Sequence, residues 1–92
     1  MLSGGEVRPM KVTLYALSTC GWCRRTKHFL EENNIPFKCY DVDLLEGEEK
    51  ERVRAEVAKH NPRRSFPTLV IDDGAKVIVG FDEVRLREGL GL

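Results

Sequence analysis

The sequence predicts a single α/β domain in which three helices flank a mixed four-stranded sheet. Three observations predict this fold. The 92 residues suffice for one modest core and are too few for two. Short β-branched and apolar runs alternate with amphipathic segments, which is typical of β-α-β units. The Asp72-Asp73-Gly74 sequence separates two further apolar runs and predicts a late hairpin.

The first half of the chain predicts a strand, a helix and a strand. Residues 12–17 form a nearly continuous apolar run, which is typical of a strand covered on both faces. A helix is predicted next, because large side chains recur at helical spacing from Trp22 until Asn33-Asn34 ends the pattern. Residues 37–43 are predicted as the second strand, and their mixed polarity suits the edge of a sheet.

The second half predicts the order helix, strand, strand, helix. Residues 47–60 form a charged amphipathic segment, and strands are expected over 66–71 and 76–79 on either side of the hairpin turn. Asp82 is expected to cap a last helix. A helical crossover makes the first two strands parallel, and the hairpin makes the last two antiparallel. The predicted order is therefore β-α-β-α-β-β-α.

The charge composition is balanced, with 15 basic and 15 acidic residues. It does not indicate nucleic acid or an anionic membrane as the main partner. The longest apolar runs are too short to span a bilayer, and residues 1–6 lack the basic and apolar regions of a secretory signal. We therefore expect a cytoplasmic monomer with a flexible leader over residues 1–9 and one domain over 10–92.

Cys20 and Cys23 form a C-x-x-C pair between the first predicted strand and the first helix. In a cytosolic protein this spacing indicates redox chemistry or metal binding more often than a structural crosslink. Cys20 would lie at the helix cap, where free N–H groups and the helix dipole favour a thiolate. Arg24, Arg25 and Lys27 add positive charge there. We therefore expect Cys20 to be the nucleophile and Cys23 to resolve the mixed disulfide.

The alternatives for this pair are inert buried thiols or half of a zinc site. Zinc requires two further ligands, and the candidates Cys39, His28 and His60 form no ligand pair at short spacing. We expect Cys39 to pack as a small hydrophobic side chain or to lie at a sheet edge, and both histidines to be solvated. The charged run 46–54 is interpreted as a soluble helix face. Trp22 is expected to be exposed and to form part of a docking surface.

Two further features follow the second helix. Phe66-Pro67 opens a buried strand, where proline is allowed at the first residue. A cis bond there would free the Phe66 backbone for an incoming peptide or thiol beside Cys20, whereas a trans bond would make an ordinary turn. Gly80 permits a close backbone approach and Asp82 opens a helix N-terminus. They could hold a carboxylate and an amine, or form only a capped turn.

In this order and spacing, the motifs resemble those of the glutaredoxin family, from about Lys11 to Leu90. The matching segments are Cys20-Gly21-Trp22-Cys23 for its C-P-Y-C motif, Arg64-Ser65-Phe66-Pro67 for R-T-V-P, and Val79-Gly80-Phe81-Asp82-Glu83 for G-G-x-D-D. The resemblance implies a thioredoxin-like fold. It also implies an enzyme that reduces protein disulfides and mixed disulfides, with no tightly bound cofactor and with glutathione as cosubstrate.

The resemblance also suggests where glutathione would bind. Arg63 and Arg64 match family positions near its glycine carboxylate. Phe66 and Pro67 match the segment whose backbone pairs with the tripeptide, and Asp82 matches the position that meets its γ-glutamyl end.

The chain departs from the family pattern at Leu17, where lysine is frequent, and at Val79, which replaces the first of two glycines. Glutaredoxin-like electron donors of ribonucleotide reductase also lack that glycine, and they take electrons from thioredoxin reductase. The electron donor therefore stays open between glutathione, another low-molecular-weight thiol and a flavoprotein reductase. Ribonucleotide reductase is one candidate among the disulfide-containing partners.

A second function from the same resemblance is an iron–sulfur carrier or sensor. Some glutaredoxins bridge a 2Fe–2S cluster between two subunits through the first cysteine of each subunit and two glutathiones. A cluster needs four thiolate ligands. Gly21 leaves room and backbone freedom that the usual proline would deny. A third interpretation, a redox-inactive adaptor, is disfavoured by the intact C-x-x-C pair.

Overall fold

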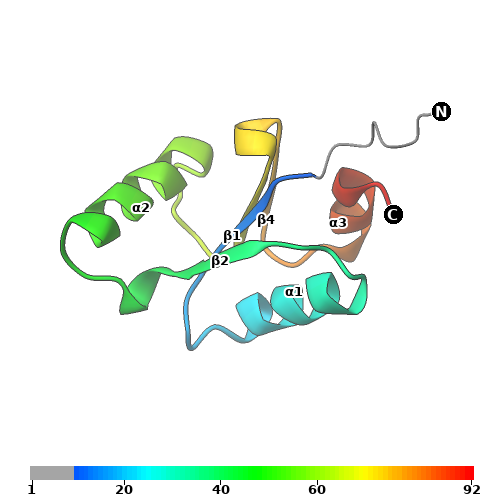
Figure 1. Cartoon of the computed structure of the whole chain (residues 1–92), viewed down its shortest axis with the longest axis horizontal. Coiled ribbons are helices and arrows are strands. Elements are labelled where there is room, and N and C mark those ends of the chain that lie inside the picture. Colours follow the sequence, from blue (N-terminus) through cyan, green and yellow to red (C-terminus); the bar gives the residue numbers. More distant parts are fainter. Residues whose placement is uncertain (1–9) are drawn as a thin grey trace.

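The computed structural model describes residues 10–92, so the leader predicted over residues 1–9 lies outside the described residues. The elements follow the predicted order (Figure 1). They are β1 (Val12–Ala16), α1 (Gly21–Glu32), β2 (Lys38–Asp41), α2 (Gly47–His60), β3 (Thr68–Ile71), β4 (Lys76–Val79) and α3 (Glu83–Leu90), with short 3₁₀ turns at Val42–Leu44 and Asp72–Gly74. Among the described residues, no helix is long and apolar enough to cross a membrane.

The four strands form one mixed sheet in the order β2-β1-β3-β4. β1 pairs in parallel with β2 and antiparallel with β3, and β3 pairs antiparallel with β4. Leu14 in the middle of β1 lies opposite Cys39 on one side and Leu69 on the other. The prediction of a mixed sheet with β2 at one edge is therefore confirmed.

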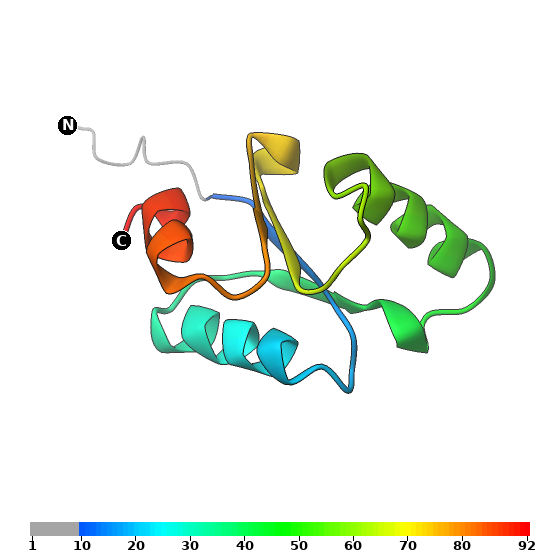
Figure 2. The same cartoon turned by 180° about the vertical axis from the view of Figure 1, so that it is seen from behind.

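The helices cover both faces of this sheet, with α1 and α3 on one face and α2 on the other (Figures 1 and 2). On the first face, the buried side chains include Leu14, Phe29, Leu30, Leu69 and Leu86. These positions belong to β1, α1, β3 and α3 and form the larger of two cores. The smaller core, beneath α2, consists of Tyr15, Val42, Val53, Val57 and Val70.

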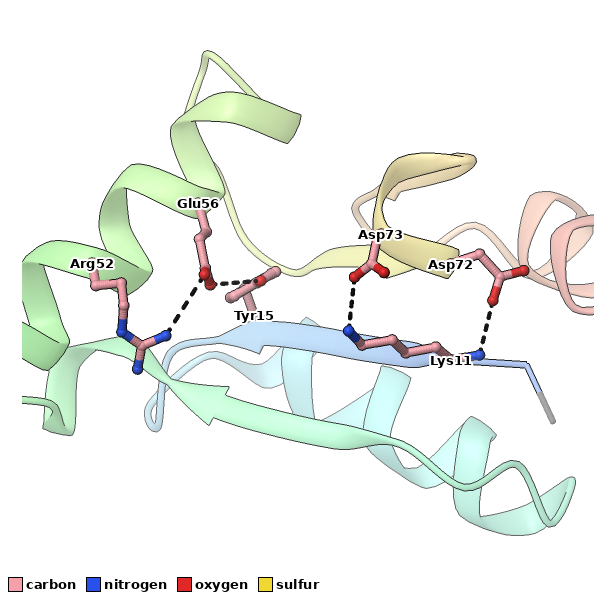
Figure 3. A network of polar contacts seen from close by, with 6 residues as sticks. All are labelled: Lys11, Tyr15, Arg52, Glu56, Asp72 and Asp73. Atoms are coloured by element: carbon pink, nitrogen blue, oxygen red, sulfur yellow. Dashed lines mark hydrogen bonds and ion pairs between the residues drawn. The ribbon is translucent and has the colours of Figure 1, made fainter.

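Polar contacts fasten β1 to its neighbours on the α2 side of the sheet (Figure 3). The Tyr15 hydroxyl donates to Glu56 Oε1 of α2 at 3.2 Å. The Lys11 backbone N–H donates to Asp72 Oδ1 at 3.0 Å, and Lys11 Nζ pairs with Asp73 Oδ1 at 2.8 Å. These bonds connect the start of β1 to the β3–β4 turn.

Four strand boundaries differ from the prediction, two of them by one residue: β1 ends at Ala16 rather than at residue 17, and β2 begins at Lys38 rather than at residue 37. β2 ends at Asp41 rather than at residue 43, because the Val42 side chain turns into the core beneath α2 and the chain leaves the sheet there. β3 begins at Thr68 rather than at residue 66. Pro67 lacks an N–H group and cannot donate to a strand ladder, so pairing starts one residue later.

Candidate active site

The structure places Cys20 at the N-cap of α1, directly beyond the end of β1. Its Sγ accepts a hydrogen bond from the Cys23 backbone N–H at 3.2 Å, and its own N–H donates to Leu17 O at 3.1 Å. The sulfur thus takes the place of the oxygen that usually caps a helix, and it faces the positive end of the helix dipole. Because Cys20 is partly exposed, a substrate disulfide can reach it.

Cys23 lies one turn into α1 and is fully buried in the larger core. Burial raises the pKa of the Cys23 thiol to about 12, and its hydrogen bond with Cys20 acts in the same direction. The Cys23 thiol therefore stays protonated at neutral pH. Of the two cysteines, only Cys20 combines access to solvent with a position at the helix N-terminus.

This difference predicts selective alkylation of the reduced protein. Because burial raises its pKa, the Cys23 thiol is expected to stay protonated and nearly unreactive across the pH range of the experiment. Brief exposure to iodoacetamide between pH 6 and 9, followed by peptide mass mapping, is expected to find the label on Cys20. Labelling of Cys23 at a comparable rate in the folded protein would contradict the assignment of roles.

A carboxylate from the 3₁₀ turn after β2 holds the loop that precedes Cys20. Asp43 accepts the Ser18 backbone N–H at 2.8 Å and also the Ser18 hydroxyl. These two bonds lower the pKa of the Asp43 carboxyl below its usual value, so it remains ionised at neutral pH. Nothing local in the sequence pointed to Asp43, because its partner lies 25 residues earlier in the chain.

The loop before β3 is organised by Asn61, a buried side chain at the C-terminus of α2. Its amide group donates to Ser65 O at 3.1 Å, to Ser65 Oγ at 3.1 Å and to Thr68 Oγ1 at 3.0 Å. Its Oδ1 accepts the Arg63 N–H at 3.2 Å. In the sequence, Asn61 followed by Pro62 indicates only the end of a helix. The available signal was a hydrogen-bonding residue directly before Pro62, which suits a structured turn.

That loop leads into Phe66-Pro67, whose peptide bond is cis. Phe66 is half-buried and packs against both cores, and Pro67 is buried. Within the described residues, no group pairs with the Phe66 backbone N–H. Pro67 O accepts the Gly80 N–H at 2.8 Å, which joins this loop to the turn after β4.

A hollow of about 270 Å³ lies beside this loop, on the α2 side of the site. Its wall is largely apolar and its rim carries three cations; it is lined by Leu17, Val42, Asp43, Lys50, Arg54, Val57, Arg64 and Phe66. Of the predicted binding residues, Arg64 and Phe66 line it, whereas Arg63 is exposed on the same loop outside the lining. Lys50 and Arg54 belong to the run 46–54, which was expected to be a soluble helix face, and both also border this hollow. Their spacing of four residues on one helix face was the available signal.

The turn between β4 and α3 uses Gly80 and Asp82 structurally. Gly80 has φ +79°, which favours glycine. The Asp82 carboxylate accepts the Arg85 N–H at 3.1 Å and caps α3. Of the two sequence interpretations, the capped turn is what the structure shows, and the binding of an amine by Asp82 stays a prediction.

On the other side of Cys20, Trp22 is 59 % exposed, as expected. Its ring stacks on Phe81, with centroids 6.2 Å apart and an interplanar angle of 18°. The Arg25 guanidinium lies 5.8 Å from the Trp22 ring centroid and 5.4 Å from that of Phe81. The positive charge of Arg25 is therefore part of an aromatic surface close to Cys20 in the chain.

Lys27 and Cys39 lie together on the side of α1 that faces β2. Lys27 Nζ pairs with Asp41 Oδ1 of β2 at 3.2 Å. From the sequence, the charge of Lys27 was expected near Cys20, whereas the structure directs it at β2. Burial raises the pKa of the half-buried Cys39 thiol, and the nearby Lys27 partly offsets this effect. Cys39 thus packs against the larger core and also lies on the edge strand β2. From the sequence, these two positions were expected as alternatives.

The two histidines occupy different environments. His28 is exposed and lies 3.2 Å from the Glu32 carboxylate, whereas His60 is half-buried, so the expectation of a solvated side chain is wrong for His60. The Gly74 backbone packs against the His60 ring, where an added Cβ would lie 3.0 Å from His60 Cε1. Among residues 10–92, histidine, cysteine and acidic side chains form no group of three that could hold a metal ion.

Comparison with known proteins identifies the family. The sequence profile of glutaredoxins matches residues 12–75. A probable glutaredoxin of Synechocystis is 33 % identical over 81 residues, which cover 88 % of this chain and 85 % of that protein. This chain belongs to the glutaredoxin family. The expectation drawn from its three motifs is therefore confirmed.

Solved structures of glutaredoxins share its fold. The methanoredoxin of Methanosarcina acetivorans is 46 % identical with a TM-score of 0.84, and the alignment covers 89 % of this chain and 85 % of that one. A glutaredoxin of Methanosarcina mazei is 49 % identical with a TM-score of 0.83, covering 89 % and 79 %. The predicted thioredoxin-like fold is confirmed. The family is one of thiol–disulfide oxidoreductases, and the Cys20–Cys23 pair is consistent with that activity.

Proposed function

We propose that this glutaredoxin reduces protein disulfides and mixed disulfides through Cys20 and Cys23. The observation that carries the proposal is the unequal pair at the start of α1. Cys20 is accessible and lies at the helix N-terminus, whereas Cys23 is buried and protonated one turn later. This arrangement suits a nucleophile and a resolving thiol.

The reaction follows from these positions. The Cys20 thiolate attacks one sulfur of a substrate disulfide, the substrate S–S bond breaks, and the first substrate thiol leaves with a proton. The Cys23 thiol then gives up its proton and attacks Cys20 Sγ. The second substrate thiol leaves, and an intramolecular Cys20–Cys23 disulfide forms. Two electrons have passed to the substrate, so two thiol equivalents or a flavoprotein reductase must restore the dithiol.

The proposed donor is a low-molecular-weight thiol that carries an anionic group, such as glutathione. This chain has Leu17 where lysine is frequent in the family. Lys50, Arg54 and Arg64 nevertheless place positive charge around the hollow beside Phe66. A carboxylate fits that rim, and the unpaired Phe66 N–H can bond to the backbone of a bound peptide. Exposed Arg63 adds charge nearby, and Gly80 and Asp82 would meet the other end of the thiol.

The proposed partners are disulfide-containing proteins, ribonucleotide reductase among them. Because the dithiol must be reduced again after every cycle, the proposed site of action is a reducing compartment such as the cytoplasm. The chain is proposed to act as a monomer.

A comparison of electron donors tests this function. The oxidised protein is mixed with glutathione, with other small thiols, or with thioredoxin reductase and NADPH, and reduction of the Cys20–Cys23 disulfide is followed by thiol titration. We expect an anionic thiol to reduce it fastest and an Arg54→Gln variant to slow that thiol more than a neutral one. If Arg54→Gln slowed the anionic and the neutral thiol equally, the cationic hollow would not be the binding site of the anionic thiol. If only thioredoxin reductase with NADPH reduced the disulfide, the electron donor would be a flavoprotein and not a small thiol.

A cluster carrier remains the second candidate, because a side chain at Gly21 would meet nothing within 4 Å. This open space lies beside Cys20 and leaves room for a bridging group. One chain offers only Cys20 as an accessible thiolate at this site, since Cys23 is buried, so a second chain and two small thiols would supply the other three ligands. Anaerobic reconstitution with iron, sulfide and glutathione tests this candidate. A colourless monomer would exclude it, and a coloured dimer that Cys20→Ser abolishes would support it.

A further inference from the structure

Trp22, Arg25 and Phe81 form a small surface beside Cys20, which we call the Trp22 platform. Trp22 and Arg25 come from the first two turns of α1, and Phe81 comes from the turn before α3. The two rings stack, and the Arg25 guanidinium lies within 6 Å of both ring centroids. Phe29 supports Phe81 from below in an edge-to-face contact with centroids 6.2 Å apart. The platform is therefore held in place although its indole is mostly exposed.

The charge of Arg25 is not neutralised within residues 10–92, where no carboxylate pairs with it. The acidic groups nearby are already engaged. Glu83 pairs with Arg87 at 3.1 Å, Glu32 lies 3.2 Å from His28, and the Asp82 carboxylate caps α3. A guanidinium stacked on aromatic rings keeps its in-plane N–H donors available for an incoming carboxylate.

The platform borders a hollow of about 220 Å³ between α1 and α3. Arg25, Phe81 and Arg87 help to line it, and so do the paired carboxylates of Glu32 and Glu83. At about 30 Å³ per water molecule, this space has room for one inserted side chain with a few waters. The hollow is distinct from the one beside Phe66, which lies on the α2 side. Cys20 therefore has a recess for a small molecule on one side and the aromatic, cationic platform on the other.

We propose that the Trp22 platform docks protein substrates that carry an acidic side chain close to their reactive cysteine. This inference rests on the proposed oxidoreductase function and specifies its substrates. The partner's apolar chain covers the exposed indole, and its carboxylate bonds to Arg25 above the Phe81 ring. Tryptophan and arginine dominate the binding energy of many interfaces, and opposite charges also speed the encounter.

Trp22 is the single tryptophan of the chain, so its fluorescence reports binding to the platform. Two peptides are compared, and in both a serine replaces the substrate's reactive cysteine. The acidic peptide has a glutamate beside this serine, and the basic peptide has a lysine at the same position. We expect the acidic peptide to change the fluorescence and to bind at least about fivefold tighter at low salt. The difference should shrink in about 0.5 M salt, because ions screen exposed charges. Equal affinities of the two peptides would overturn the proposal.

Arg25→Gln should abolish the preference for the acidic peptide, and Lys76→Gln is the matched control. Lys76 is an exposed cation at the start of β4. In the strand register it lies opposite Ile71 of β3, and Ile71 lies opposite Val12 at the start of β1. Lys76 thus lies at the end of the sheet opposite Cys20. Loss of the preference in both variants would mean that only net charge matters, and it would overturn a role for the platform.

The same peptides with cysteine in a disulfide test the reaction itself. The ratio of kcat/KM for the acidic and the basic peptide is expected to be about five or more, and to fall to about one in Arg25→Gln. Any general effect of the substitution on Cys20 cancels in this ratio. If both disulfides are reduced at the same rate, docking is wrong and the enzymatic function stands. If neither is reduced but the acidic serine peptide binds selectively, docking stands and the enzymatic function is wrong.

Discussion

A Cys20→Ser variant is expected to lose disulfide reduction by about a thousandfold or more. A serine hydroxyl is not ionised at neutral pH and forms no mixed disulfide, so the first step of the reaction is removed. The helix should still form, because serine is a good N-cap residue and can accept the same Cys23 N–H. The loss would therefore be chemical rather than structural, and circular dichroism with a thermal melt would verify this.

The other two cysteines provide the controls for this experiment. Cys23→Ser should retain reduction of a glutathione mixed disulfide, which needs only one protein thiol, and should lose reduction that requires the resolving step. Cys39→Ser is the matched control, since Cys39 lies on the edge strand β2 outside the pair. Full activity of Cys20→Ser towards a mixed disulfide would disprove the assigned chemistry.

The second large effect is expected from Asn61→Ala, which should destabilise the fold by about 2–3 kcal/mol. The side chain is buried, its amide hydrogens are shared among three acceptors, and its carbonyl oxygen accepts the Arg63 N–H. Each buried group left without a partner is expected to cost about 1 kcal/mol or more. For a domain of this size the melting temperature should fall by about 10 °C or more, which calorimetry would measure.

Asn33→Ala is the matched control for this substitution. Asn33 occupies the same position at the end of α1, but it is only half-buried and its amide makes one local bond, to Phe29 O at 2.9 Å. Its loss should cost about 1 kcal/mol or less. Asn61→Asp keeps the shape of the side chain and replaces its donors by a buried charge, so it should destabilise at least as much as alanine. Equal melting temperatures for the Asn33 and Asn61 alanine variants would show that the Asn61 network contributes little.

Much of the fold was predictable because its signals are local. The bounds of α2 were predicted to the residue from the charged amphipathic run, with Val53 and Val57 buried one turn apart. The caps at Cys20 and Asp82 followed from residue type and position. Of the larger errors at strand ends, the one at the end of β2 arose from a tertiary contact, since the Val42 side chain enters the core beneath α2. The one at the start of β3 arose from the missing N–H of Pro67.

Less of the candidate site was predictable, because its parts come from distant segments. The C-x-x-C pair and the Phe66-Pro67 segment were identified from spacing. The position of Lys50 and Arg54 beside the hollow near Phe66 was not predicted, since a charged helix face carries no sign of what lies opposite it. The charge of Lys27 was assigned to Cys20, whereas Asp41 on β2 attracts it.

By itself, the sequence determined the order of elements, the helix caps and the place of the two cysteines at the end of a strand. These features depend on periodicity and on bonds between residues a few positions apart. Only the tertiary structure decided that Cys23 is buried and protonated, that Asp43 holds Ser18, and that Trp22 stacks on Phe81. Burial and long-range bonds exist only once the sheet has brought distant segments together. That packing supports the roles that we propose for the two cysteines of the C-x-x-C pair.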